Sequence, residues 1–205
     1  VTLDFSNISQ LKLVQKLSAL DFLYIVKSLP FLCIVLFGLL INILSLFELG
    51  NLFGTATLPR TWRMLQAGET LSLSIIICTF LYTGMLIQRS RIYKSNELID
   101  ITPVKNWVLF GSKFLAIIKM QALLLLLVMV SGITFQFYKG FYDFELNLYL
   151  YELLILNLLY YVIWAFLSFL VHTLIPNPYL GLFVMLVLFH LKKKILLIGM
   201  IKKKN

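Results

Sequence analysis

The stretch that decides the fold is Phe31–Phe47, FLCIVLFGLLINILSLF, which contains no charged residue. About 20 apolar residues in a helix cover the roughly 30 Å hydrocarbon layer of a bilayer, so this stretch and its flanks predict a membrane-spanning helix. Pro176-Asn177-Pro178 predicts a tight turn. A fifth apolar run begins after it, near Tyr179, and meets Lys192 after about a dozen residues, which is short for a crossing. Between the first run and this last one lie three long apolar runs, at about 70–87, 114–136 and 153–171.

The composition of the whole chain agrees with a membrane protein. Of the 205 residues, 60% are hydrophobic and 13% are charged, against about half and about a quarter in a soluble domain. The apolar residues form unbroken runs and do not alternate with polar ones, so they favour helices over the strands of a membrane barrel. We therefore expect an all-α fold, a polytopic membrane helical bundle with about five transmembrane helices.

Charge divides the chain into three parts. Residues 1–29 mix apolar and charged side chains, which is typical of a helix lying in the membrane interface. Residues 30–190 are predicted to form the transmembrane domain, which includes a polar loop at 88–112, and the segment 51–69 is predicted to be a connecting loop. Residues 191–205 form a lysine-rich tail.

The lysine and arginine residues predict the orientation. The 88–112 loop with the adjoining Lys113 carries five basic residues, against two in the first loop and one in the third. Cytoplasmic loops carry the excess of basic residues, so the 88–112 loop and the N-terminal helix are expected on the cytoplasmic side. If successive helices cross the membrane in alternate directions, the lysine-rich tail lies outside, which conflicts with the same rule. We therefore expect that this end is not native and that a returning sixth helix is missing.

The net charge of +9 does not indicate nucleic-acid binding. Six of the positive charges are lysines of the tail, and without them the balance is +3; such a surplus beside apolar runs usually reflects membrane topology. The sequence contains neither an H-E-x-x-H zinc pair nor a G-x-x-x-x-G-K-[ST] phosphate loop. Its two histidines are too few for a zinc site, so no catalytic residue, metal or cofactor is expected.

Two polar residues stand out in the fourth apolar run, Glu152 and Asn157. Polar and ionisable groups within a membrane are functional candidates by default, and lining a water-filled path they would suit a secondary carrier. We favour a structural role for both residues over a role in transport. Glu152 lies near the outer interface beside Tyr149 and Tyr151, and Asn157 is expected to hydrogen-bond to a neighbouring helix.

The 88–112 loop is long enough for a short helix that ends before Thr102-Pro103, because a residue that precedes proline is disfavoured in the helical conformation. Ile92, Leu98 and Ile99 stand there among charged neighbours. Such a helix docks into a groove on a soluble partner in many complexes. A merely solvated loop explains the composition equally well.

The order of several residues resembles the permeases of type-2 ATP-binding cassette (ABC) transporters. The similarity is to the bacterial subfamily in which the permease is fused to an aminopeptidase-N-like metallopeptidase, and it extends from about Val1 to Phe189. The residues that carry it are Gly54, Pro59–Thr61, Arg89–Lys94, Asn96–Asp100, Pro103-Val104, Asn106-Trp107, Ser112-Lys113, Tyr138–Gly140, Phe144–Leu146, Tyr149-Leu150, Val171-His172 and Pro178–Gly181.

The resemblance implies one half of a permease with six helices in the bacterial inner (plasma) membrane, working with a second permease half or a second copy. It also implies a coupling helix at about Arg91–Asp100 that seats on a separate ATP-hydrolysing subunit, and it favours export. The partner-contact residues would be Arg91, Ile92, Glu97, Leu98, Ile99 and Asp100. The family has an acidic residue near the start of this loop, where this chain has Gln88-Arg89-Ser90-Arg91.

The last fifteen residues depart from the family pattern, so we expect a fragment that lacks the sixth helix and any peptidase domain. Two alternatives stay open. In one, the helices merely anchor a membrane-bound metallopeptidase; in the other, the chain is a secondary carrier that uses Glu152 and Asn157.

Overall fold

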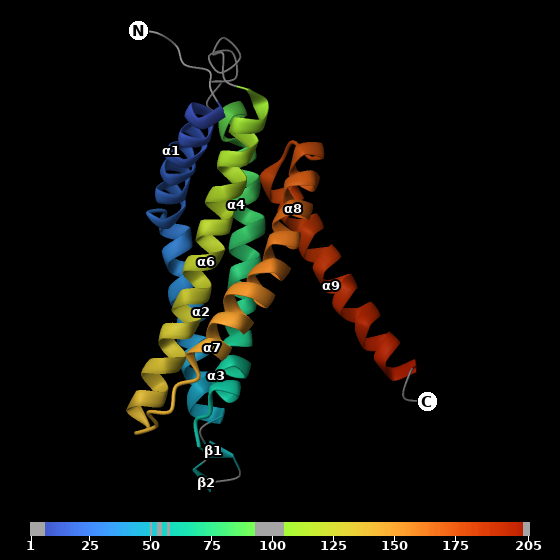
Figure 1. Cartoon of the computed structure of the whole chain (residues 1–205). Coiled ribbons are helices and arrows are strands. Elements are labelled where there is room, and N and C mark those ends of the chain that lie inside the picture. Colours follow the sequence, from blue (N-terminus) through green and yellow to red (C-terminus); the bar gives the residue numbers. More distant parts are fainter. Residues whose placement is uncertain (1–6, 50, 53–54, 57, 93–104, 203–205) are drawn as a thin grey trace.

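The structure is a computed structural model that describes residues 7–49, 51–52, 55–56, 58–92 and 105–202. It confirms the all-α fold (Figure 1). The only strands in this part of the chain have two residues each, and they pair antiparallel as a small hairpin. The elements are α1 (Asn7–Val26), α2 (Leu29–Leu49), β1 (Asn51–Leu52), β2 (Thr55–Ala56), α3 (Thr61–Gly68), η1 (Glu69–Leu71), α4 (Ser72–Ile92), α6 (Asn106–Tyr138), α7 (Leu146–Tyr149), η2 (Leu150–Asn157), α8 (Leu158–Leu174) and α9 (Pro178–Lys202).

Four helical stretches of the described chain are long and apolar enough to cross a membrane, and a fifth apolar helix, Pro178–Lys192, is shorter. The four long stretches match the first four apolar runs of the sequence, and the fifth is short as predicted. They are Leu29–Glu48, Thr61–Arg89, Asn106–Tyr138 and Leu146–Leu174.

The second of these stretches begins earlier than the sequence predicts. Part of the segment interpreted as a connecting loop, 51–69, is helical: α3 continues through the short 3₁₀-helix η1 into α4. Gly68 and Glu69 keep right-handed helical dihedrals, with φ of −60° and −59°. Neither the glycine nor the charge breaks the helix, so the loop prediction is wrong from Thr61 onward, and Glu69 lies inside a long apolar helix.

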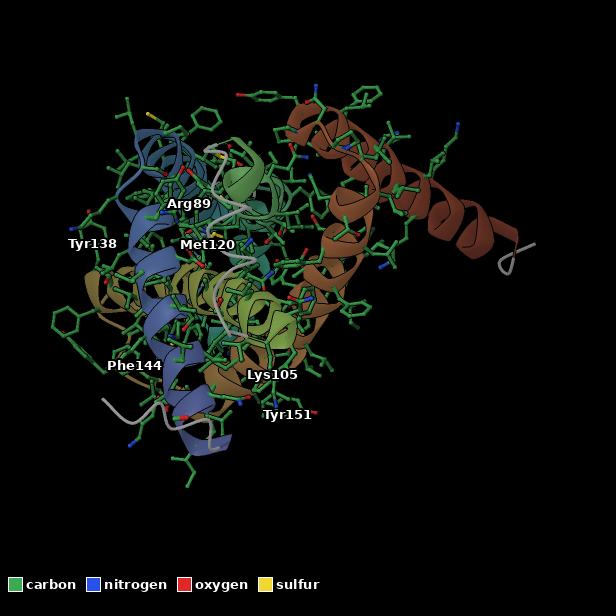
Figure 2. All side chains as sticks on the ribbon, turned by 90° about the horizontal axis from the view of Figure 1, so that it is seen from above. Arg89, Lys105, Met120, Tyr138, Phe144 and Tyr151 are labelled. Atoms are coloured by element: carbon green, nitrogen blue, oxygen red, sulfur yellow. The ribbon has the colours of Figure 1, made fainter. Side chains whose placement is uncertain are left out.

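Helix α6 is the centre of the bundle, since α1, α2, α3, α4 and α8 all pack on it. The α8–α9 turn lies at the same end of the bundle as the start of α6, and the β1–β2 hairpin lies at the other end (Figure 1). Seen from above, α1 crosses over α6 (Figure 2), and α6 is its main contact. This arrangement leaves α1 lying across one end of the bundle.

Proline and asparagine set the turn before α9. Asn177 accepts a hydrogen bond at Oδ1 from the backbone N–H of Tyr179, 2.9 Å away, and Pro178 opens the helix, where its missing N–H costs no helical hydrogen bond. The turn predicted at Pro176–Pro178 is confirmed. It reverses the chain between α8 and α9.

Buried amide side chains link the helices inside the apolar core. Gln121 of α6 donates from Nε2 to Thr79 Oγ1 of α4 and to the backbone carbonyl of Tyr161 of α8, each at 3.0 Å. Asn42 of α2 donates to the carbonyl of Ala67 of α3 at 3.2 Å. It also accepts at 2.9 Å from the Ser131 hydroxyl of α6. Such bonds between helices in an apolar medium contribute about 0.5–2 kcal/mol each.

Candidate functional site

A pocket of about 490 Å³ lies in the bundle, between the α3–η1–α4 helix, α6, the η2–α8 helix and α9. We call it the bundle pocket. Its apolar wall includes Leu125 and Val128 of α6 and Leu153 of η2. Its polar lining residues are Glu69, Ser72, Asn157, Tyr160, Tyr161 and Lys192. A pocket of this size, mostly apolar and with a few converging polar groups, is the usual form of a small-molecule site.

Glu69 brings a carboxylate to this pocket. It is the ninth residue of the 29-residue apolar stretch Thr61–Arg89, and its side chain is exposed. Within the described ranges the only ion pair joins Arg89 to Asp21, and Glu69 has no cationic partner there. The Glu69 carboxylate is therefore free of any ion pair within the part of the chain that the structure describes.

One wall of the bundle pocket is formed by a π-helix. Residues Leu150–Asn157 form the π-helix η2, in which the backbone N–H of Leu158 bonds to the carbonyl of Leu153. Both Leu153 and Asn157 belong to this segment and line the bundle pocket. Stretches of π-helix occur frequently at functional sites, because they change which side chains face inward.

Lys192 approaches the pocket from α9 and contacts aromatic rings. Its Nζ atom lies 4.6 Å from the ring centroid of Tyr160 and 5.2 Å from that of Trp164. These are cation–π distances, at which a ring face attracts positive charge. The lysine ammonium is thus held by Tyr160 and Trp164, on the α8 side of the pocket.

A second polar cluster joins α1 to the start of the 88–112 loop. The Arg89 guanidinium of α4 donates to Asp21 Oδ1 of α1 at 3.0 Å, and it lies 4.6 Å from the centroid of the Tyr24 ring. Figure 2 shows Arg89 beside α1 at this end of the bundle. Lys119 of α6 donates to the Ser18 hydroxyl at 2.7 Å. We call these five residues the α1 junction.

Burial raises the pKa of Asp21 above its ordinary value, and the nearby positive charges of Arg89 and Lys113 oppose this shift. The Asp21 side chain is 16% exposed, whereas that of Arg89 is 42% exposed. Desolvation of the carboxylate outweighs its attraction to a partner that is itself well hydrated. The ion pair fixes the position of α1 more than it stabilises the fold.

The predicted partner-contact residues lie next to the α1 junction or beyond the described ranges. Arg91 and Ile92 form the last residues of α4. Glu97, Leu98, Ile99 and Asp100 lie outside the described residues. The two ends of the predicted 88–112 loop are helical, since residues 88–92 belong to α4 and residues 106–112 belong to α6. The docking role of the segment between them stays a prediction.

The two intramembrane polar residues predicted from the sequence separate in the structure. Asn157 lines the bundle pocket and Glu152 does not, although both belong to η2. Sequence reasoning missed Glu69, Tyr160, Tyr161 and Lys192. One signal for Glu69 was available, since it is the only acidic residue between Glu48 and Glu97 and is followed at once by an apolar run.

The histidine and carboxylate residues of the described chain do not form a metal-binding cluster of three or more. His172 is buried, and its Nδ1 lies 2.8 Å from the backbone carbonyl oxygen of Ser168. Its ring packs between Gly84 of α4 and Gly181 of α9. This environment gives His172 a packing role between three helices.

No protein-family model, curated protein or solved structure matches this chain.

Proposed function

We propose that this chain is a membrane-spanning permease component of a type-2 ABC transporter, most consistent with export, in the bacterial inner membrane. It would cross the membrane several times with its N-terminus in the cytoplasm. A separate ATPase subunit would bind the 88–112 loop, and a second permease half or a second copy would complete the transporter. The motif series from Gly54 to Gly181 is the sequence support for this proposal.

The observation that carries the proposal is the α1 junction. The 88–112 segment includes the end of α4, up to Ile92, and the start of α6, from Asn106, so it links these two helices. Arg89 of α4 and Lys119 of α6 are both bonded to α1, through Asp21 and Ser18. A push on the loop would therefore move α1, α4 and α6 together.

Such a connection suits a transporter that is driven by rigid-body motion. The protein needs no catalytic residue of its own, because ATP hydrolysis in the partner supplies the energy and the loop receives the displacement. Helices that move as a packed unit convert that displacement into exchange between inward-open and outward-open arrangements.

Co-purification tests the proposal. The chain is co-expressed with tagged ABC ATPase subunits from the same genome, and we expect one of them to retain it in detergent. Ile99→Asp places a charge in the proposed apolar contact and should reduce recovery of the complex at least about tenfold, which corresponds to about 1.4 kcal/mol.

Leu58→Asp is the matched control, since Leu58 is 64% exposed and precedes α3, at the end of the bundle remote from α1 (Figure 1). It should leave recovery unchanged. Equal recovery of the ATPase subunit with Ile99→Asp and with the parent chain would contradict the docking assignment. Absence of any retained ATPase would favour the interpretation of the helices as an anchor.

A further inference from the structure

We propose that the bundle pocket binds a lipophilic organic cation, with the Glu69 carboxylate as its counter-charge. The inference goes beyond the proposed function, because occupation of this site requires neither an ATPase subunit nor transport. It rests on the charge, the aromatic rings and the apolar walls of the pocket.

The charge comes from Glu69. Its side chain is exposed, and a carboxylate beside apolar walls attracts a cation more strongly than one in bulk water does. In the part of the chain that the structure describes, no lysine or arginine pairs with Glu69. The other charged residue of the lining is Lys192, and its ammonium lies over the rings of Tyr160 and Trp164. Glu69 and Lys192 are thus the two formal charges of the lining, and the Glu69 carboxylate is the one without a contact partner among the described residues.

Aromatic residues make the same pocket favourable for a cation. Tyr160, Tyr161 and Phe189 all line it, and aromatic ring faces attract organic cations with about 0.5–2 kcal/mol each. The rings of Tyr160 and Trp164 already hold one ammonium group, that of Lys192. The aromatic wall formed by Tyr160 and Trp164 can therefore hold a positive charge, although it has no carboxylate.

The remaining lining selects for a lipophilic molecule over a metal ion. Leu65, Leu125, Val128 and Leu153 contribute apolar surface, and Glu69 is the only carboxylate in the lining. Hard metal cations require six or more oxygen ligands, usually with several carboxylates. A volume of about 490 Å³ is instead that of a site for a drug-sized organic molecule.

Two probes of the same shape and opposite charge test the proposal. Tritiated tetraphenylphosphonium, a cation, and tetraphenylborate, an anion, are titrated onto the purified chain in lipid nanodiscs, and binding to empty nanodiscs is subtracted. We expect saturable binding of the cation in preference to the anion. Glu69→Gln should weaken cation binding at least about tenfold, the effect of one lost ion pair of about 1.4 kcal/mol.

Glu152→Gln is the matched control, because Glu152 belongs to η2 but does not line the pocket, and it should leave binding unchanged. Asn157→Phe keeps the charge and fills the pocket, so it should also weaken binding, and this keeps the test decisive if Glu69→Gln does not fold. Unchanged cation binding in folded Glu69→Gln overturns the proposal. The proposal is also overturned if the parent chain prefers tetraphenylborate and Lys192→Gln abolishes that preference. None of these outcomes depends on recovery of an ATPase subunit.

Discussion

At the scale of single residues, Asp21 makes the fold sensitive to pH. Because burial raises its pKa, the folded chain binds this proton more tightly than the unfolded chain does. Stability should therefore fall as pH rises from the ordinary aspartate pKa, about 3.9, through the raised value, and this contribution should level off above it. Asp21→Asn should remove that part of the pH dependence, as measured by melting temperature in detergent from about pH 4 upward.

Asp143→Asn serves as the control for this measurement, because Asp143 is an exposed aspartate in the loop after α6. Its pH profile should match that of the parent chain. If the parent chain instead gains stability relative to Asp21→Asn over the same pH range, the ion pair with Arg89 outweighs the burial of the carboxylate.

At the scale of helices, the contact between α4, α8 and α9 depends on two glycines. A Cβ atom at Gly84 or at Gly181 would lie 2.6 Å from Cδ2 of His172, and the His172 ring is held by Ser168. Overpacking of this kind typically costs about 1–3 kcal/mol. We expect Gly84→Ala and Gly181→Ala each to lower the melting temperature measurably.

Gly111→Ala is the control for this pair, since a Cβ atom there meets no atom within 4 Å and alanine favours a helix over glycine by about 1 kcal/mol. It should leave the melting temperature unchanged or raise it. In His172→Ala chains the cost of Gly181→Ala should largely disappear, because the clashing ring is gone. A cost that persists without the ring would place the strain elsewhere.

Elements that depend on local sequence features are predicted from the sequence, whereas those that depend on tertiary contacts are not. The first apolar run and the Pro176–Pro178 turn are local features, and both were predicted. The start of the second helix is predicted too late, because Pro59, Arg60, Trp62 and Arg63 are typical of a loop. Gln121 also interrupts an apolar run, but its partners on α4 and α8 depend on tertiary packing and leave no local pattern in the sequence.

The candidate site also depends on contacts between residues that are far apart in the sequence. Asn157 stands out in the sequence because it interrupts an apolar run, whereas Lys192 belongs to the predicted tail and Tyr160 gives no signal of its own. Their proximity depends on how α9 packs beside α8, which a single sequence does not encode in any local pattern. The site residues come from η1, η2, α8 and α9, so tertiary contacts alone bring them together.

At the scale of the whole molecule, the four long apolar stretches place alternate connections at opposite ends of the bundle. The end of α4, the start of α6 and the α1 junction lie at one end, and the β1–β2 hairpin and the connection after α6 lie at the other (Figure 1). With the excess of basic residues in the 88–112 loop, the proposed membrane orientation puts the first end in the cytoplasm.

Single cysteines test this orientation. Lys105 and Asp143 are exposed at opposite ends of the bundle, so Lys105→Cys and Asp143→Cys are compared after Cys33 and Cys78 are replaced by serine. A membrane-impermeant maleimide should label Asp143→Cys in right-side-out vesicles and Lys105→Cys only in inverted ones, because a charged reagent does not cross the hydrocarbon layer. The cysteine-free chain sets the background. The reverse pattern would invert the orientation, and equal labelling of both positions in sealed vesicles would mean that the bundle does not separate them across a membrane.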